Sequence, residues 1–370
     1  MTQPIQTEPA ADRQTAGLDR RNMLKLTGAG IAALGAASTF NASTAKAQTM
    51  TDEWDKTFPR SENVDHQKVT FTNRYGITLA GDLYLPKNRG ENRLPALAVS
   101  GPFGAVKEQS SGRYAQTMAE RGFVTLAFDP SYTGESGGEP RHVASPDINT
   151  EDFSAAVDCL GLQPNVDRDR IGIIGICGFA GMALTAITSD SRSISRSHQD
   201  SYTIEQRHAV LDYLGQKRWA DVDNGTHALG LHEVPFDESG NLVEGQRILP
   251  EELPENPDPV LAAFFDFYRT ERGFHPRSIN STTAWTATTP MAFFGFPMYA
   301  NIEMASPRPI LLIAGENAHS RYYSEDVIKA APDPKELLIV PGADHVDLYD
   351  QMDKIPFDRL AGFFNEHLAA

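Results

Sequence analysis

The sequence has few cysteines, no excess of positive charge and no long apolar run, and each lack excludes a class of protein. Its 370 residues include only two cysteines, Cys159 and Cys177, too few for a disulfide scaffold or a thiolate metal cluster. Acidic residues outnumber basic ones by 49 to 33, which argues against nucleic acid as a partner. No uninterrupted apolar run of about 18 residues predicts a membrane-spanning helix, so we expect no stable membrane anchor. With 40% hydrophobic residues, the composition indicates an acidic globular enzyme.

The first 47 residues have the order of zones that an export signal requires. An arginine pair at 20–21 precedes a weakly apolar segment at about 26–40, and the Ala-Lys-Ala sequence at 45–47 suits a signal peptidase. The pattern resembles a twin-arginine signal. We therefore expect the mature chain to begin near Gln48, the protein to be periplasmic or secreted, and the precursor to have the twin-arginine export machinery as a partner.

The rest of the chain alternates strand patterns with helix patterns. Short apolar runs predict strands at 68–72, 77–85, 95–100, 123–128, 170–175, 309–314 and 336–341. Helical spacing predicts helices at 109–121, 151–162, 182–188, 203–220 and 258–269, and from about 324 and 355. Strands separated by helices imply an α/β class fold, a mostly parallel twisted sheet with helices on both faces. Ligands in such sheets bind at the carboxyl ends of the strands.

Cys177 is the candidate nucleophile. The sequence Gly-Ile-Cys-Gly at 175–178 lies where a buried strand turns abruptly into a helix, and the glycines let neighbouring backbone pass closely. The start of a helix also lowers the pKa of a thiol. Cys159 lies among apolar residues of an amphipathic helix without such a context, which predicts core packing.

A cysteine nucleophile needs a base, and His345 is the best placed of ten histidines. It follows the last predicted strand, where the order nucleophile, acid, histidine puts the base, and a carboxylate would fix its tautomer. Glu316, after the preceding strand, is the candidate acid. Asp347 and Asp129 remain possible acids, whereas Asp344 is adjacent to His345 in sequence, so its side chain is expected to point elsewhere. His227 and His232 have poor spacing for metal ligands, so we expect no metal site.

Two backbone amides are candidates for an oxyanion hole, the pair of donors that stabilises a tetrahedral intermediate. One belongs to Phe103, in the glycine- and proline-containing loop after the strand at 95–100, and the other to Gly178. The loop glycines could instead simply form a turn.

Five motifs together resemble the α/β-hydrolase superfamily, in the branch with a cysteine nucleophile that includes dienelactone hydrolases and fungal polyketide acyltransferases. They are GPFGAVKEQ at 101–109, FDPSYTGES at 128–136, GICG at 175–178, AHSR at 318–321 and ADHVD at 343–347. The likeness extends from about Val69 to the C-terminus. It implies cleavage or transfer of acyl groups by Cys, His and a carboxylate without a cofactor, which agrees with the lack of a phosphate loop.

The resemblance also gives the domain boundaries and one discrepancy. We divide the chain into a signal peptide (1–47), two parts of the hydrolase core (48–189 and 309–370) and a cap-like helical insertion (190–308). The superfamily fold has another buried strand after the helix at 182–188. Residues 189–200 contain one aliphatic residue in twelve, so we expect this strand to be missing and the member to be shortened or compromised.

Three functions remain open. The leading one is hydrolysis of an ester, lactone or thioester through an acyl-cysteine intermediate; the others are acyl transfer with the same residues and non-catalytic binding. The expected partner is a small, hydrophobic acyl substrate. Six large apolar residues in the insertion could form a pocket wall for it or simply pack on the sheet: Trp285, Phe293, Phe294, Phe296, Met298 and Tyr299.

Overall fold

The computed structural model describes residues 54–188, 203–231, 234–237, 239–245, 247–296 and 298–369. The predicted export signal at 1–47 and the serine-rich segment at 189–200 lie outside these residues. All described residues belong to one compact unit, and the division into core and insertion stays a prediction.

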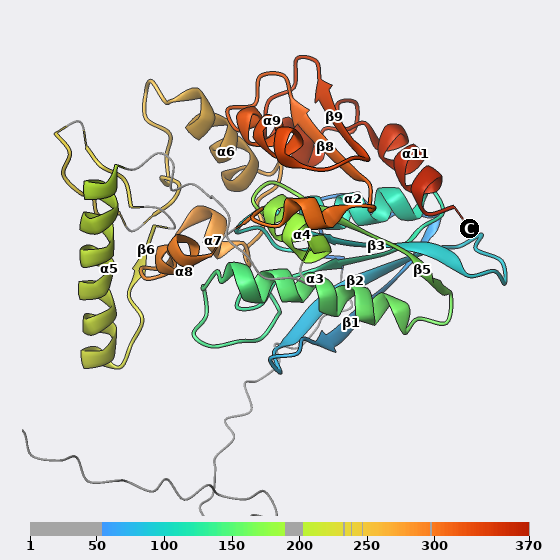
Figure 1. The fold of residues 1–370 in the computed structure, drawn as a ribbon, viewed down its shortest axis with the longest axis horizontal. Helices are drawn as coiled ribbons and strands as arrows, with labels where there is room; N and C mark the ends of the chain where they lie inside the picture. Colours follow the sequence, from blue (N-terminus) through green and yellow to red (C-terminus); the bar gives the residue numbers. More distant parts are fainter. Residues whose placement is uncertain are drawn as a thin grey trace, which may run out of the picture. The chain divides into compact units, whose positions relative to one another are not determined.

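The central element is a five-stranded mixed sheet with the order β1-β2-β4-β3-β5 (Figure 1). Its strands are β1 (Val64–Thr72), β2 (Thr78–Pro86), β3 (Leu94–Ser100), β4 (Val124–Phe128) and β5 (Val166–Gly175). The pairs β1/β2 and β2/β4 are antiparallel, and β4/β3 and β3/β5 are parallel. The predicted α/β-hydrolase architecture is confirmed, and each of these strands lies where its apolar run indicated.

Alternate residues of the central strands are buried in two different cores. In β3, Leu97 and Val99 join the core formed with helices α2 and α11, whereas Ala96 and Ala98 join the one formed with α3 and α4. A strand buried on both faces needs apolar residues at nearly every position, which is why these strands are continuous apolar runs. The four helices are α2 (Ser110–Ala119), α3 (Pro146–Gly161), α4 (Phe179–Thr188) and α11 (Phe357–His367).

The prediction placed the start of α3 five residues too late. Pro146 occupies the first turn, where its missing N–H costs nothing, and the Asn149 side chain accepts a hydrogen bond from the Ser145 amide at 3.1 Å. Pro146 is therefore the first residue of the helix.

The described residues of 203–308, within the predicted insertion, form helices joined by long loops. They contain α5 (Ile204–Asn224), α6 (Pro259–Arg269), α7 (Ile279–Thr282), α8 (Pro290–Gly295), a 3-10 turn η2 (Ile302–Ala305) and the short strands β6 (Leu229–Gly230) and β7 (Trp285–Thr286). Thr203 caps α5 in the expected way, with its hydroxyl accepting from Gln206 N and its amide donating to the Gln206 side chain. Within the described ranges, no helix is both long and apolar enough to span a bilayer.

The last two strands form a separate sheet. β8 (Ile310–Gly315) and β9 (Lys335–Val340) pair in parallel with α9 (Arg321–Ala330) between them, and α10 (Asp347–Asp350) follows. Within the described residues, β5 pairs only with β3 and β8 only with β9, so no strand joins the two sheets. The prediction of a missing strand rests on residues 189–200, which lie outside the described residues, so it stays a prediction. Residues of β5 and β8 line the same cavity of about 2250 Å³ instead.

This gap predicts uneven hydrogen exchange. A strand paired on one side leaves about half of its amides without a ladder partner. We expect those amides in residues 171–175 and 310–315 to exchange at least ~100-fold faster than the amides of β3, which is paired on both sides. Deuterium uptake measured on peptides from these strands tests this. Equal protection of β3, β5 and β8 would show that the gap is closed in solution.

Candidate active site

Cys177 lies at the sharp turn between β5 and α4. Its backbone φ is +57°, a left-handed conformation that is strained for a residue with a side chain. The next helix starts at once, because Ala180 N donates to Cys177 O at 2.9 Å. Position 175, two residues before Cys177, accommodates only glycine, because a Cβ on Gly175 would lie 2.4 Å from the carbonyl oxygen of Phe179. The turn therefore presents the half-buried Cys177 side chain at the end of the strand, as the sequence indicated.

His345 faces this sulfur from the loop after β9. The Cys177 thiol hydrogen-bonds to His345 and Tyr349, and the Gly178 amide also donates to it. Burial by itself raises the pKa of the Cys177 thiol, but the charge and hydrogen bond of His345 outweigh it and bring the pKa down to about 7. Burial lowers the pKa of His345, but the Cys177 sulfur raises it more. The pair thus favours a thiolate beside an imidazolium.

Glu316 does not orient His345, and this correction concerns the predicted acid. Its exposed carboxylate accepts from Gly342 N at 2.8 Å, because the chains after β8 and β9 remain paired and turn its side chain that way. Ser320 takes the position instead, with its hydroxyl 2.6 Å from His345 Nδ1. The prediction failed because only carboxylates were considered for this role.

The other acidic candidates are also engaged elsewhere. The Asp344 carboxylate accepts from the amides of Val346 and Asp347, both at 3.0 Å. The Asp347 carboxylate binds the Lys354 ammonium and the Gln351 amide. Within the described residues, the direct partner of His345 Nδ1 is therefore a hydroxyl, and the nearest carboxylate influence is the charge of Asp344 on the ring.

The two candidate oxyanion donors belong to adjacent backbone segments. A Cβ built on Gly178 would lie 3.1 Å from the Cβ of Phe103. Gly101 has φ +99°, and a Cβ there would lie 2.3 Å from Ile176 O, so the loop after β3 passes directly against the turn that carries the cysteine. This arrangement places both segments next to Cys177, as an oxyanion hole requires.

A buried ionic cluster anchors the Phe103 loop. The Lys107 side chain is fully buried and its ammonium binds Glu108, Asp129 and Glu135. Asp129 also accepts from the Lys107 amide at 2.7 Å, which fixes the loop backbone. Burial opposes the charge of Lys107, but these carboxylates outweigh it and hold its pKa well above the usual range. Asp129 therefore supports the loop and lies away from His345.

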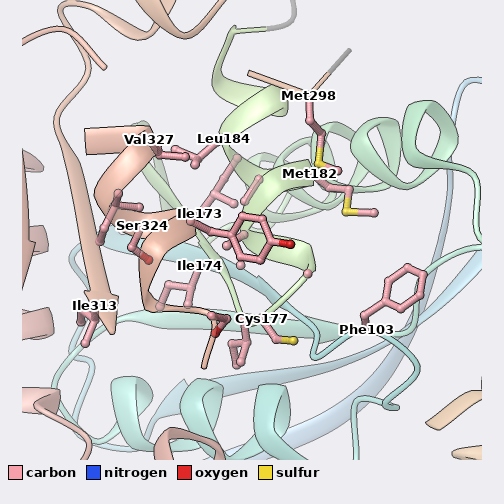
Figure 2. Close-up of a pocket in the computed structure, with 18 of the residues that line it drawn as sticks. Phe103, Ile173, Ile174, Cys177, Met182, Leu184, Met298, Ile313, Ser324 and Val327 are labelled. Atoms are coloured by element: carbon pink, nitrogen blue, oxygen red, sulfur yellow. The ribbon is translucent and has the colours of Figure 1, made fainter. Parts of the chain in front are cut away.

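Cys177 opens onto the large cavity (Figure 2). Its wall is mainly apolar: Phe103, Met182 and Leu184 line it together with Ile173 and Ile313. Five of the six apolar residues singled out in the insertion also line it, namely Trp285, Phe293, Phe294, Met298 and Tyr299. The Trp285 ring stacks on the Phe103 ring with centroids 4.5 Å apart. These residues thus both pack against the loop and form the pocket wall.

The sequence analysis did not identify Tyr349 and Tyr268. Both side chains are buried beside the Cys177 sulfur, and the Tyr349 hydroxyl lies 3.0 Å from His345 Nε2. The i, i+4 spacing of His345 and Tyr349 could have indicated that their side chains share a face. Cys159, by contrast, is buried in the α3 core as predicted. The described residues hold no group of His, Cys, Asp and Glu suited to a metal ion, and His232 lies outside them.

Comparison with known proteins places this geometry in a family. The pattern of the X-Pro dipeptidyl-peptidase (S15) family matches residues 75–230. An uncharacterized protein of Pseudomonas aeruginosa, PA2218, is 59% identical over 333 residues, covering 86% of this chain and 85% of that protein. Its crystal structure matches with a TM-score of 0.77, over 86% of this chain and 98% of the other. The uncharacterized protein YcjY of Escherichia coli K12 is 33% identical over 323 residues, covering 82% of this chain and 99% of that protein.

More distant relatives have named activities. The thiohydrolase aneE of Aspergillus aculeatus is 27% identical over 298 residues, covering 75% of this chain and 85% of that protein. The crystal structure of the α/β hydrolase GrgF from a Penicillium species matches with a TM-score of 0.65 at 21% identity. The match covers 83% of this chain and 100% of the GrgF chain. The sheet, the turn at Cys177 and these matches together show that the chain belongs to the α/β-hydrolase superfamily, in one family with PA2218 and YcjY.

Proposed function

We propose that the protein hydrolyses an ester, lactone or thioester through a covalent acyl-Cys177 intermediate. At the coarser level, it is an enzyme of the hydrolase or acyltransferase type that acts on ester-type bonds. The observation that carries the finer proposal is the Cys177 thiol, held on a strained turn beside His345 with its pKa lowered to about 7.

The proposed chemistry assigns one task to each group. The Cys177 sulfur forms a bond to the carbonyl carbon, while His345 keeps the thiol proton on Nε2. The amides of Phe103 and Gly178 stabilise the oxyanion. When the carbonyl re-forms, His345 gives its proton to the leaving group. Water then attacks the acyl-cysteine, His345 accepts its proton, and the acid and the free thiol are released.

Acyl transfer is the second candidate because the same intermediate serves both reactions. An alcohol, amine or thiol would take the place of water, and such a reaction requires that water be excluded from the acyl-enzyme. The apolar wall of the cavity supports a hydrophobic acyl group as the substrate. Non-catalytic binding would keep the cavity but require no activated thiol.

Mass spectrometry of the intact protein distinguishes these functions. Mixing with a chromogenic short-chain ester should add one acyl group, which peptide mapping should locate on Cys177 and which water should remove. Faster release of the chromophore with an added alcohol, together with formation of the new ester, would indicate transfer. A protein that acquires no acyl group while an alkylating agent still reaches Cys177 would be a binder, and the proposal would be wrong.

Replacing Ser320 tests the corrected orienting group. Ser320→Ala removes the hydrogen bond to His345 Nδ1, and we expect kcat/KM to fall about 5-fold, because such a bond contributes roughly 1 kcal/mol. Glu316→Gln, whose side chain is exposed and bonds Gly342, should change kcat/KM less than about 2-fold. Steady-state kinetics on both variants provide the measurement. The reverse order of effects would restore Glu316 as the triad acid.

We also propose that the precursor is exported by the twin-arginine route and acts outside the cytoplasm. The support is the order of the zones in residues 1–47. Fractionation of cells that produce the full chain should place the mature protein in the periplasm or medium. Replacement of both arginines, Arg20 and Arg21, by Lys should leave it as precursor in the cytoplasm, and unchanged export of this variant would contradict the proposal.

A further inference from the structure

One hydroxyl next to the sulfur has no task in the acyl-transfer steps described above. Tyr349 lies on α10, four residues after His345, and its Oη is 3.0 Å from His345 Nε2. The same hydroxyl forms a hydrogen bond with the Cys177 thiol. A single oxygen atom thus contacts both members of the candidate catalytic pair.

The tyrosine ring is held in place on all sides. Its side chain is 1% exposed, and aromatic rings surround it: the centroids of Phe267, Phe264 and Tyr268 lie 5.2, 6.4 and 6.2 Å from its own. A ring packed in this way has one orientation, so its hydroxyl has a fixed position. The contact with the sulfur therefore does not depend on a mobile side chain.

The helix that carries Tyr349 is fixed as well. The Asp344 carboxylate accepts from two amides at the start of α10, and the Tyr114 hydroxyl donates to Leu348 O at 2.7 Å. These bonds hold the backbone on both sides of His345. They also provide a second tyrosine, Tyr114, whose hydroxyl supports α10 through a backbone carbonyl.

Counting donors and acceptors gives the direction of each bond. An imidazolium has two N–H donors, a thiolate only accepts, and a phenol can do both once. With Nδ1–H donating to Ser320 Oγ, Nε2–H is shared between Tyr349 Oη and the Cys177 sulfur, and Oη–H can donate to the sulfur. Burial raises the phenol pKa well above its usual value, so Tyr349 keeps its proton throughout.

We propose that Tyr349 is a positioning residue that stabilises the Cys177 thiolate in the resting enzyme by linking His345 Nε2 to the sulfur. This rests on the proposed function, because it assumes that the thiolate is the working form. Once the sulfur has bonded to the carbonyl carbon in the tetrahedral intermediate, the negative charge lies on the oxyanion and the bond from Oη–H to the sulfur weakens. His345 is then free to give its Nε2 proton to the leaving group, while Tyr349 neither gains nor loses a proton.

The test is the pH dependence of Cys177 alkylation by iodoacetamide, followed on the Cys177 peptide so that Cys159 does not contribute. Tyr349→Phe keeps the ring and removes the hydroxyl. We expect the midpoint of the profile to move up by roughly one pH unit, because a hydrogen bond to a charged group is lost. At pH 7, kcat should fall roughly 5-fold with little change in KM, because fewer molecules carry the thiolate.

Tyr114→Phe is the matched control. It also removes one buried tyrosine hydroxyl that holds α10, but this hydroxyl bonds the backbone rather than the sulfur. Its alkylation profile should coincide with that of the unaltered protein. An equal shift in both variants would assign the effect to a loosened helix and overturn the proposal. A Tyr349→Phe profile with an unshifted midpoint would also overturn the proposal for Tyr349. The proposed acyl-Cys177 chemistry would still stand if Cys177 of the unaltered protein titrates near pH 7.

A second measurement does not require Tyr349→Phe to fold. Uniform incorporation of 3-fluorotyrosine preserves the shape of the ring and makes each phenol a stronger hydrogen-bond donor. The midpoint for Cys177 should then move to lower pH. An unchanged midpoint in the fluorinated protein would show that no tyrosine hydroxyl stabilises the thiolate, and the proposal would be wrong.

Discussion

Cys177→Ala should lower kcat/KM for an activated ester by about 10⁴-fold or more, because it removes the atom that forms the covalent intermediate. The fold should survive, since Cys177 is half-buried and alanine is smaller. Thermal unfolding of the variant should therefore stay within a few degrees of the unaltered protein. Ester turnover and the unfolding temperature, measured on the same preparation, give both numbers.

Cys159→Ala provides the comparison within the same chain. Cys159 is packed in the α3 core, and burial raises the pKa of its thiol. Its replacement should cost roughly 1 kcal/mol of stability and change kcat/KM less than about 2-fold. An equal loss of activity in both variants, accompanied by equal destabilisation, would mean that the cysteines act through folding rather than chemistry.

Lys107→Met should destabilise the protein by about 3–5 kcal/mol, because it leaves the buried Asp129 carboxylate without its cation, whereas Glu108 and Glu135 keep Arg277. Lys329→Met is the control: Lys329 is exposed, pairs only with the exposed Asp326, and its loss should cost less than about 1 kcal/mol. Urea unfolding at pH 8 measures both. Similar small changes in the two variants would contradict the proposed role of the cluster.

The loss of unfolding free energy caused by Lys107→Met should become smaller as the pH falls. Burial raises the pKa of Asp129 to about 6, with the attraction of Lys107 opposing this rise. Since the folded state binds this proton more tightly than the unfolded state, acidification through pH 6 favours folding, and removal of the cation strengthens the effect. Urea unfolding at pH 5 and pH 8 should give a smaller difference between variant and unaltered protein at pH 5.

The sequence revealed the sheet because its central strands are buried on both faces. Runs such as the one at 95–100 must be apolar at nearly every position, and their lengths are those of strands. The turn at Cys177 was also predictable, because a glycine is needed where a Cβ would meet the Phe179 carbonyl. The polar composition of residues 189–200 predicts a missing strand, but these residues lie outside the described part of the chain, so this stays a prediction.

The partners of His345 could not be predicted in the same way. The sequence places Glu316 and Ser320 in one short loop, and only the pairing of the chain after β8 with the chain after β9 turns Glu316 away. Tyr349 reads in the sequence as one more buried aromatic residue. Its hydroxyl acquires a specific role only through the position of the Cys177 sulfur, which comes from a distant part of the chain.

The cluster around Lys107 was missed for a related reason. Lysine and acidic residues in a loop usually predict an exposed surface, because burying a charge is costly. Here Asp129 and Glu135 come from the loop after β4 and surround the ammonium from another side. Such a cluster depends on how two loops meet, and no local pattern in the sequence reports that.

The most direct test of the account is the alkylation rate of Cys177 measured from pH 5 to pH 10, with His345→Ala alongside the unaltered protein. The lowered thiol pKa predicts a midpoint near pH 7, with the rate falling about tenfold for each pH unit below it. Without the imidazole, the midpoint should rise to the range of an ordinary thiol, ~8.5 or above. A Cys177 that titrates in that range in the unaltered protein, and is indifferent to His345→Ala, would contradict the thiolate–imidazolium pair.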